Sequence, residues 1–180
     1  MTEWLDELES EAWRGYLRMQ VQLNAQLSRL LQAGSDLSDA DFHVMVELSE
    51  LDGDRMRVFE LAERLQWERS RLSHHLTRME RRGLVQRSGC PSDGRGAFVA
   101  LTVEGSRAIE AAAPGHIEAV RRYFIDLLER DQLQALVDIA GRVLAHLPAP
   151  VCTGTPGDVG PTPTEPAPSG SVAGGYPTAV

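Results

Sequence analysis

The sequence of 180 residues contains no lysine and no overall excess of positive charge. All 18 basic residues are arginine, and 26 aspartate and glutamate residues bring the formal net charge to −8. A net negative charge argues against nucleic-acid binding because phosphate repels it, but it does not show where each charge lies. Arginine suits phosphates and base edges because its guanidinium group donates two parallel hydrogen bonds. A compositional bias of the genome explains the lack of lysine more simply.

Cysteine is scarce, and long apolar runs and a basic N-terminal region are missing. Cys90 and Cys152 are too few for a disulfide framework, which is typical of a protein in a reducing cytoplasm. No apolar run approaches the ~20 residues that a membrane helix needs. The acidic first 13 residues lack the basic region of a secretory signal. We therefore expect a cytoplasmic protein without a membrane partner.

The composition changes sharply at residue 148. Residues 148–180 contain 8 of the 10 prolines, 6 of the 16 glycines and only two charged side chains. Such a segment buries too little apolar surface to offset the entropy of ordering it. We expect a disordered tail over these residues; the alternative is a proline-rich docking segment.

Apolar residues recur every three or four positions from Leu5 to Leu30, which predicts one long helix that ends at Gly34. Ser38 followed by Asp41 resembles a capping box and predicts the start of a second helix. The elements expected next are a strand over residues 56–58, helices over residues 59–65 and 68–82, and a β-hairpin built from residues 84–87 and 98–101.

Glycine, threonine and proline indicate further boundaries. Gly83 has the usual position of a helix stop, and Thr102 is expected to cap a fifth helix. Pro114 is expected to break or kink that helix. A last helix places the apolar residues from Leu133 to Leu147 on one face. The predicted fold class is mainly α with a small β-hairpin wing: a winged helix-turn-helix flanked by further helices.

The order helix, short turn, helix, hairpin over residues 59–101 is that of a winged helix-turn-helix. In its second helix Leu72, Leu76 and Met79 share the face that must pack inward. The opposite face carries hydroxyl, imidazole and guanidinium groups, which suit base edges near the N-terminal end and phosphates further back. The predicted DNA-binding residues of this helix are Arg69, Ser70, Arg71, Ser73, His74, Thr77 and Arg78, with phosphate contacts from Arg57, Arg81, Arg82 and Arg87.

The net charge of −8 argued against nucleic-acid binding, but the distribution of charge along the sequence weakens that argument. Residues 55–95 contain ten arginines and five acidic residues, a net charge of +5, so the remaining residues carry −13. Positive charge is therefore concentrated where the motif places a nucleic-acid surface. The alternative explanation, a solvated arginine-rich helix without a ligand, does not account for the adjoining hairpin.

Five motifs lie along this region: LAERL at 61–65, SRL at 70–72, RRGLVQR at 81–87, DGR at 93–95 and LTVEG at 101–105. Together they resemble the MarR family of bacterial regulators, and the resemblance covers residues 37–105. It implies a sequence-specific regulator that binds double-stranded DNA and acts as a ligand-responsive repressor. Such a protein is cytoplasmic and associates with the nucleoid when it is bound to DNA.

The resemblance also implies a homodimer held by the first and last helices. We therefore expect dimerisation helices over residues 1–36 and 106–147, on either side of a DNA-binding lobe over residues 37–105. A two-fold dimer implies a palindromic operator. The wing arginine of the family corresponds to Arg95, which would enter the minor groove while Asp93 orients the wing.

A small aromatic effector is implied by the family in the same way, bound between the dimer helices and the lobe. Trp13, Tyr16 and His43 are candidate lining residues, although packing explains them equally well. Two other function classes remain as alternatives: a winged-helix interaction module without DNA binding, and an enzyme. The sequence has no nucleophile elbow, phosphate loop or paired-carboxylate framework, so an enzyme is the least favoured class.

Three residues in or next to the predicted helix over residues 68–82, which we call the recognition helix, are assigned by the side of the helix on which they lie. His75 shares the inward face and is predicted to pack there, whereas its neighbour His74 faces outward. Trp67 is predicted to anchor the turn to the core. The two histidines with Cys90 do not form a metal site, because adjacent helical side chains point about 100° apart. No metal and no cofactor is expected.

Overall fold

A computed structural model describes residues 4–51, 55–90 and 93–148, without the side chains of residues 90–96. Apart from Pro148, the predicted tail lies outside the described residues. The described chain is mainly helical with a small antiparallel sheet, which confirms the predicted fold class. Its elements are α1 (Glu7–Gly34), α2 (Asp39–Ser49), β1 (Met56–Arg57), α3 (Val58–Leu65), α4 (Arg69–Arg81), β2 (Val85–Cys90), β3 (Asp93–Leu101), α5 (Val103–Tyr123), the 3₁₀ turn η1 (Ile125–Leu127) and α6 (Arg130–His146).

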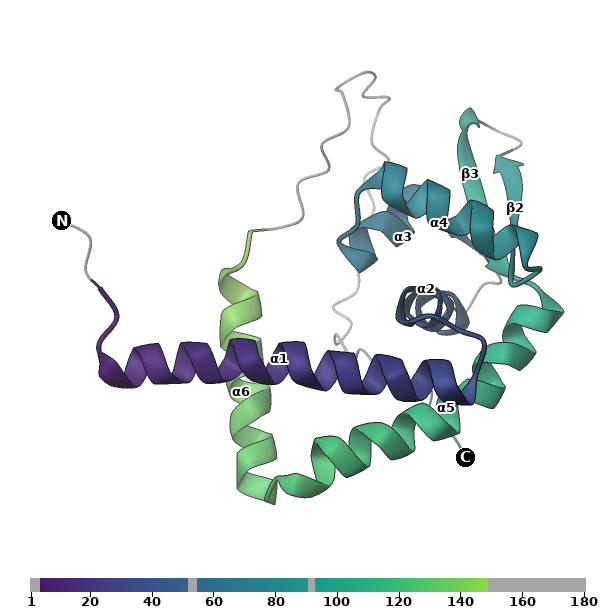
Figure 1. The fold of residues 1–180 in the computed structure, drawn as a ribbon. Helices are drawn as coiled ribbons and strands as arrows, with labels where there is room; N and C mark the ends of the chain where they lie inside the picture. The colour runs from purple at the N-terminus through teal and green to yellow at the C-terminus, as the bar shows by residue number, and fades with distance from the viewer. Residues whose placement is uncertain (1–3, 52–54, 91–92, 149–180) are drawn as a thin grey trace.

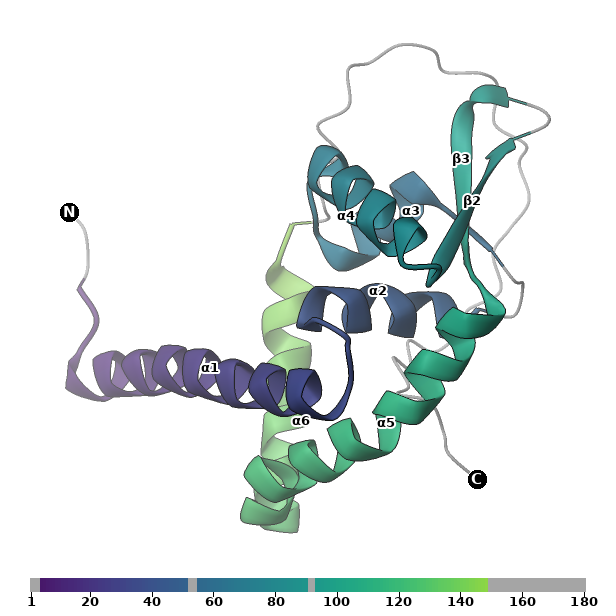
Figure 2. The same cartoon turned by 45° about the vertical axis from the view of Figure 1, so that its right-hand side comes forward.

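The helices and the sheet divide into a lobe and a set of extended helices. In both views α4 and the β2–β3 hairpin lie at the upper end, and α2 lies between them and the helices α1 and α5 (Figures 1 and 2). Helix α5 leads from the hairpin to α6, and α1 packs against α5. Helix α4 and the β2–β3 hairpin therefore lie side by side on the side of the lobe that α1 does not cover.

The sheet has the strand order β1-β3-β2, so the long strand β3 lies in the middle. Both pairings are antiparallel; Met56 pairs with Val99, and Val85 pairs with Leu101. The hairpin is longer than the sequence indicates, because its strands continue through the glycine-rich segment around Gly89. The register changes between Gly89 and the following residue, which is the signature of a bulge.

Most of the predicted boundaries follow from local hydrogen bonds. The backbone N–H of Asp41 donates to Ser38 Oγ at 3.1 Å and the backbone N–H of Ser38 donates to Asp41 Oδ2 at 2.9 Å, so the capping box is confirmed. Thr102 Oγ1 accepts from the N–H of Gly105 at 2.9 Å and caps α5. Of the break or kink expected at Pro114, the break does not occur, because α5 continues through this residue. Pro114 is exposed, so water can reach the carbonyl that loses its helical partner.

The hydrophobic core lies between α2, α3, α4 and the sheet. Leu72, Leu76 and Met79 of α4 are 0% exposed, as are Val44 and Leu61 from the facing helices. Each buried side chain of this size contributes about 1.5–3 kcal/mol relative to exposure. The inward face predicted for α4 is therefore confirmed, and it fixes which side of the helix remains accessible.

Helices α1 and α6 expose apolar side chains to solvent in the single chain. Helix α6 buries none of its residues, and Val137 and Leu144 are 64% and 66% exposed. On α1, Leu8 and Val21 are 74% and 69% exposed. Among the described residues, no helix is both long enough and apolar enough to span a membrane.

Candidate nucleic-acid interface

The outer face of α4 is polar and accessible along its whole length. Its exposed residues include hydroxyl groups at the N-terminal end and guanidinium groups toward the C-terminal end. Short polar groups and arginine are the side chains that read base edges and phosphates. The side chains that the structure places on this face are Arg69, Ser70, Arg71, Ser73, His74, Arg78 and Arg81.

Trp67 supports Arg71 from the turn between α3 and α4. The Arg71 guanidinium carbon lies 4.3 Å from the centroid of the Trp67 ring, a cation–π geometry. The ring is half-buried against the core, which confirms the predicted anchor. The turn itself requires Gln66 in the left-handed region, at a φ of 53°. Arg71 is thus held above the surface by an aromatic platform.

A buried cluster connects α4 with the first turn of α2. His75 Nε2 lies 3.0 Å from Asp41 Oδ1, and Arg82 Nη1 donates to Asp41 Oδ2 at 2.7 Å. The side chains of His75 and Asp41 are 8% and 4% exposed, so the inward packing predicted for His75 is confirmed. Burial alone would raise the pKa of Asp41, but the hydrogen bonds from Ser38 and Arg82 lower it below its ordinary value. Burial lowers the pKa of His75, against the opposing charge of Asp41.

Two of the four arginines predicted to contact phosphates form ion pairs with acidic side chains of the same chain. Arg82 pairs with Asp41 and also donates to the carbonyl of Asp36. Arg87 donates to Glu80 Oε2 through Nε at 3.0 Å and Nη2 at 2.7 Å, and these hydrogen bonds lower the pKa of Glu80. The sequence prediction did not anticipate these partners, because Asp41 lies 41 positions from Arg82, and Arg87 lies beyond the end of the helix that contains Glu80.

Thr77 also differs from its predicted place on the accessible face. Its hydroxyl donates to the carbonyl of Ser73 at 2.9 Å and accepts from Arg87 Nη2 at 3.1 Å. The residue is half-buried between α4 and the hairpin. Its hydroxyl proton is already used, so within this fold Thr77 links helix and wing.

Arg57, a third predicted phosphate contact, stacks on an aromatic ring of the wing. Its guanidinium carbon lies 5.1 Å from the centroid of Phe98, and that of Arg55 lies 4.7 Å away. Sequence reasoning assigned no contact to Arg55, and the only available signal was its membership of the basic segment 55–95. Arg81, the fourth predicted phosphate contact, is exposed, and no acidic group in the described part of the chain pairs with it.

The predicted wing residues Arg95 and Asp93 belong to strand β3. Their side chains lie outside the described residues, so the minor-groove contact of Arg95 and the orienting role of Asp93 stay predictions. What the structure does place is the hairpin backbone, which lies beside α4 at one end of the lobe (Figure 1).

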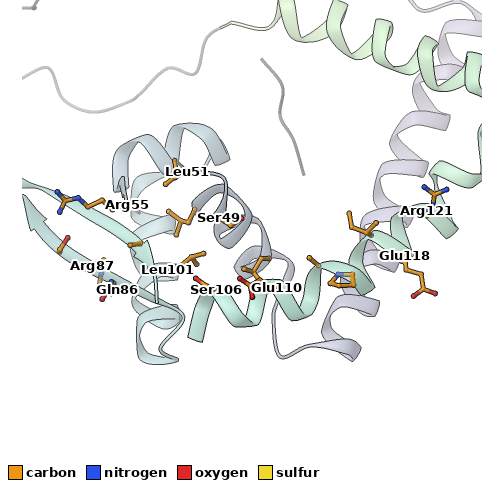
Figure 3. Close-up of a pocket in the computed structure, with 17 residues that line it drawn as sticks. Ser49, Leu51, Arg55, Gln86, Arg87, Leu101, Ser106, Glu110, Glu118 and Arg121 are labelled. Atoms are coloured by element: carbon orange, nitrogen blue, oxygen red, sulfur yellow. The ribbon is translucent and has the colours of Figure 1, made fainter. Parts of the chain in front are cut away.

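One pocket in the described part of the chain has a volume of about 1230 Å³. It lies between the end of α2, the strands β2 and β3, and α5 (Figure 3). Leu101 and Ile109 contribute apolar walls, and Arg55 and Glu110 contribute charge. A smaller pocket of about 250 Å³ lies between α1 and α5. The residues predicted to line an effector site, Trp13, Tyr16 and His43, line neither of these pockets. The rings of Trp13 and Tyr16 stack on each other, with ring centroids 5.8 Å apart. His43 Nδ1 lies 3.6 Å from Asp39 Oδ2.

Comparison with known proteins agrees with this geometry. The model of the MarR family matches residues 37–96, the segment that contains the helix-turn-helix and the start of the wing. AbsC, a MarR family transcriptional regulator from Streptomyces coelicolor, is 42% identical to this chain; the match covers 81% of this chain and 97% of AbsC, with a TM-score of 0.77. The chain belongs to the MarR family.

Two further relatives support the same membership. Sco3205, a MarR family transcriptional regulator from Streptomyces coelicolor solved in complex with DNA, is 38% identical, and the match covers 81% of this chain and 90% of Sco3205 with a TM-score of 0.76. An uncharacterised HTH-type transcriptional regulator of Bacillus cereus is 28% identical over 134 residues, which are 74% of this chain and 87% of that protein. All three relatives are named as transcriptional regulators.

Proposed function

We propose that this MarR-family regulator is a homodimeric repressor that binds a palindromic operator, with one α4 helix in the major groove of each half-site. The observation that carries the proposal is the polar, arginine-bearing outer face of α4 beside the β2–β3 hairpin (Figure 1). The complex of the related Sco3205 with DNA favours this function over a protein-interaction module. Such a protein acts in the cytoplasm and associates with the nucleoid when bound.

Residues along α4 divide by position into two groups in this proposal. Ser70, Arg71, Ser73 and His74 lie in the first turns and contact base edges, since the N-terminal end of a recognition helix enters the groove. Arg78 and Arg81 lie further along and contact phosphates. We further propose that Arg95 inserts into the adjacent minor groove, with Asp93 orienting the wing.

Exposed apolar surface on α1 and α6 supports the homodimer. Val137, Val143 and Leu144 are each more than half exposed on a helix that buries nothing in its own chain. A contiguous apolar surface of this kind marks an association site in a soluble protein. A two-fold dimer then requires a two-fold operator, with half-sites about one DNA turn or ~10 bp apart.

The DNA-binding experiment is a gel shift on the DNA upstream of the protein's own gene, across a salt series and against a scrambled duplex. We expect preference for the upstream DNA and an affinity that falls steeply with salt, because arginine contacts release counterions from the phosphates. Equal and weak binding to both duplexes would contradict the proposal.

The dimer is tested separately by sedimentation. Val143→Glu places a charge on the exposed apolar face of α6 and should dissociate the dimer, whereas Gln134→Glu, on the same helix, adds the same charge at a position that is already polar. A dimer that survives Val143→Glu unchanged would contradict the use of this face.

Regulation by a ligand forms part of the proposal, with the 1230 Å³ pocket as the effector site. Its apolar walls with a few charged groups suit a small aromatic acid or phenol, because apolar contacts give affinity and charge gives orientation. Of the arginines that line it, Arg121 is held by Asp126 at 2.6 Å, while Arg55 stacks on Phe98. The test is whether a panel of small aromatic acids releases the DNA from the wild type but not from Ile109→Trp, whose larger side chain narrows the pocket at its apolar wall.

A further inference from the structure

The ring of His75 lies directly beneath the DNA-facing surface and has a charged neighbour at each nitrogen. Nε2 lies 3.0 Å from Asp41 Oδ1, and Nδ1 lies 2.9 Å from Arg78 Nη2. His75 is buried, whereas Arg78 is exposed on the outer face of α4. The imidazole therefore bridges the core and one of the arginines of the candidate interface.

The chemistry of the three groups determines where the imidazole proton lies. A guanidinium group only donates hydrogen bonds, so Nδ1 of His75 must be the unprotonated acceptor for Arg78. The single proton of the neutral ring is then on Nε2, where it faces the carboxylate of Asp41. That carboxylate only accepts, so the Asp41–His75 contact sets an N–H donor against an acceptor at 3.0 Å, although the alignment of this contact falls short of a hydrogen bond in the structure.

Asp41 is itself fixed by two donors from other elements. The backbone N–H of Ser38 and Nη1 of Arg82 both donate to its Oδ2, at 2.9 Å and 2.7 Å. This leaves Oδ1 for the imidazole. The charged groups that face His75 are Asp41 from α2 and Arg71 and Arg78 from α4, and the Trp67 ring meets it edge-on with centroids 5.5 Å apart.

We propose that Asp41 and His75 are positioning residues that hold the Arg78 guanidinium in place for DNA. The proposal rests on the proposed function, because it requires α4 to contact DNA. An arginine that is already held loses less conformational freedom when it binds, and this raises affinity without adding a contact. Asp41 acts only through the ring: it selects the tautomer that can accept from Arg78.

Asp41→Asn tests the choice of tautomer. The two donors on the Oδ2 side retain the amide oxygen there, so the amide NH₂ faces His75 and Nε2 must become an acceptor. The proton then moves to Nδ1 and opposes the N–H of Arg78, and the contact is lost. The matched control is Asp39→Asn, which removes the same charge from the same turn of α2, where Asp39 lies 3.6 Å from exposed His43 and acts electrostatically on His116, away from His75 and Arg78.

Two substitutions of His75 separate its nitrogens without altering Asp41. His75→Gln retains a donor near the position of Nε2 and loses the acceptor for Arg78. His75→Asn retains an acceptor near the position of Nδ1 and loses the contact with Asp41. If Asp41→Asn does not fold, this pair still tests the proposal, since only the first should weaken DNA binding.

The experiment measures affinity for the upstream duplex by fluorescence anisotropy, at a temperature where circular dichroism reports every variant folded. Arg78→Ala should weaken binding about ten-fold. Asp41→Asn should weaken DNA binding roughly three- to ten-fold when Arg78 is present. In a protein that already carries Arg78→Ala, the same substitution should cause no additional loss, because Asp41 acts through Arg78 and the two effects are not additive. Nitrogen-15 shifts of the imidazole should report the Nε2–H tautomer in the wild type and its loss in Asp41→Asn, and Asp39→Asn should change neither readout.

Two results would overturn the inference in distinguishable ways. Equal losses from Asp41→Asn with and without Arg78 would mean that Asp41 acts on the fold and not through Arg78. If Arg78→Ala binds like the wild type while the tautomer still changes in Asp41→Asn, the proposed DNA contact of Arg78 is wrong and nothing remains to be positioned. If the upstream DNA is not bound at all, the proposed function fails, and the nitrogen-15 shifts still show whether the Nε2–H tautomer exists.

Discussion

Replacing Arg82 and Arg81 one at a time should separate stability from DNA binding in two adjacent arginines. Arg82 Nη1 lies 2.7 Å from Asp41 Oδ2, and the Asp41 side chain is only 4% exposed. Arg82→Ala therefore leaves a buried carboxylate with its main cationic partner removed. Arg81 lies one position earlier, is exposed and has no acidic partner in the described part of the chain.

The expected loss follows from the burial of the pair. Removing one partner of a fully buried ion pair costs about 3–5 kcal/mol, because the other charge is left uncompensated. The Arg82 side chain is 41% exposed, so water screens part of this interaction. Asp41 also keeps the N–H of Ser38 and the contact with His75. We expect a loss of about 2 kcal/mol, which lowers the melting temperature by roughly 4–8 °C in a fold of this size.

The assay is thermal unfolding at fixed protein concentration, since the stability of a dimer depends on it. The same variants are then titrated with DNA over a salt series. Arg81→Ala should change stability by less than about 0.5 kcal/mol and lower the salt slope by about one. The reverse pattern for Arg82→Ala, an unchanged melting temperature with a lower salt slope, would refute the reasoning and restore the phosphate contact predicted from sequence.

Three other predictions concern Gly105, the histidines His75 and His116, and Arg95. A Cβ at Gly105 would lie 2.0 Å from the Leu84 carbonyl oxygen, so Gly105→Ala should lower the free energy of unfolding by about 1–3 kcal/mol, measured by urea titration. The control is Gly115→Ala, where a Cβ meets no atom within 4 Å; it should leave the free energy of unfolding unchanged or raise it by up to about 1 kcal/mol. Burial lowers the pKa values of His75 and His116. The unfolded chain therefore binds protons first as the pH falls below about 6.5, and the free energy of unfolding should decrease there, less steeply in His75→Gln. Arg95→Ala should weaken operator binding about ten-fold with an unchanged melting temperature, and an unchanged affinity would exclude the wing from the interface.

Local sequence signals predicted the elements that position the interface. The spacing of Leu72, Leu76 and Met79 identified the buried face of α4, and all three are fully buried. Gly83 follows the end of α4 at Arg81 and has a φ of 73°, the left-handed conformation expected of a glycine that stops a helix. Ser38 and Thr102 accept the capping hydrogen bonds that their positions indicated. Each of these features depends on residues within about one helical turn of one another, which is the range that sequence patterns describe.

Contacts between distant residues could not be read from the sequence. Arg82 and Asp41 are separated by 41 positions, and no local pattern distinguishes Arg82 from its neighbour Arg81. The pairing of Arg87 with Glu80 depends on where the hairpin turns back on α4. Asp41 was recognised only as a cap, although its second oxygen faces His75. The missing break at Pro114 has another cause: solvent at an exposed helix position makes a proline tolerable, and exposure is a tertiary property.

The pairing pattern also changes what the charge of the basic segment means. The +5 of residues 55–95 includes Arg82 and Arg87, whose charges are compensated by Asp41 and Glu80 inside the fold. The uncompensated guanidinium groups of α4 lie on its outer face instead, and two of them, Arg71 and Arg78, are supported by Trp67 and His75 from below. A field that attracts DNA needs exposed charge, whereas a contact that selects a sequence needs charge in a fixed place. In this lobe Asp41, acting through the buried ring of His75, and the half-buried ring of Trp67 provide the second property, so an acidic side chain from outside the basic segment contributes to the interface.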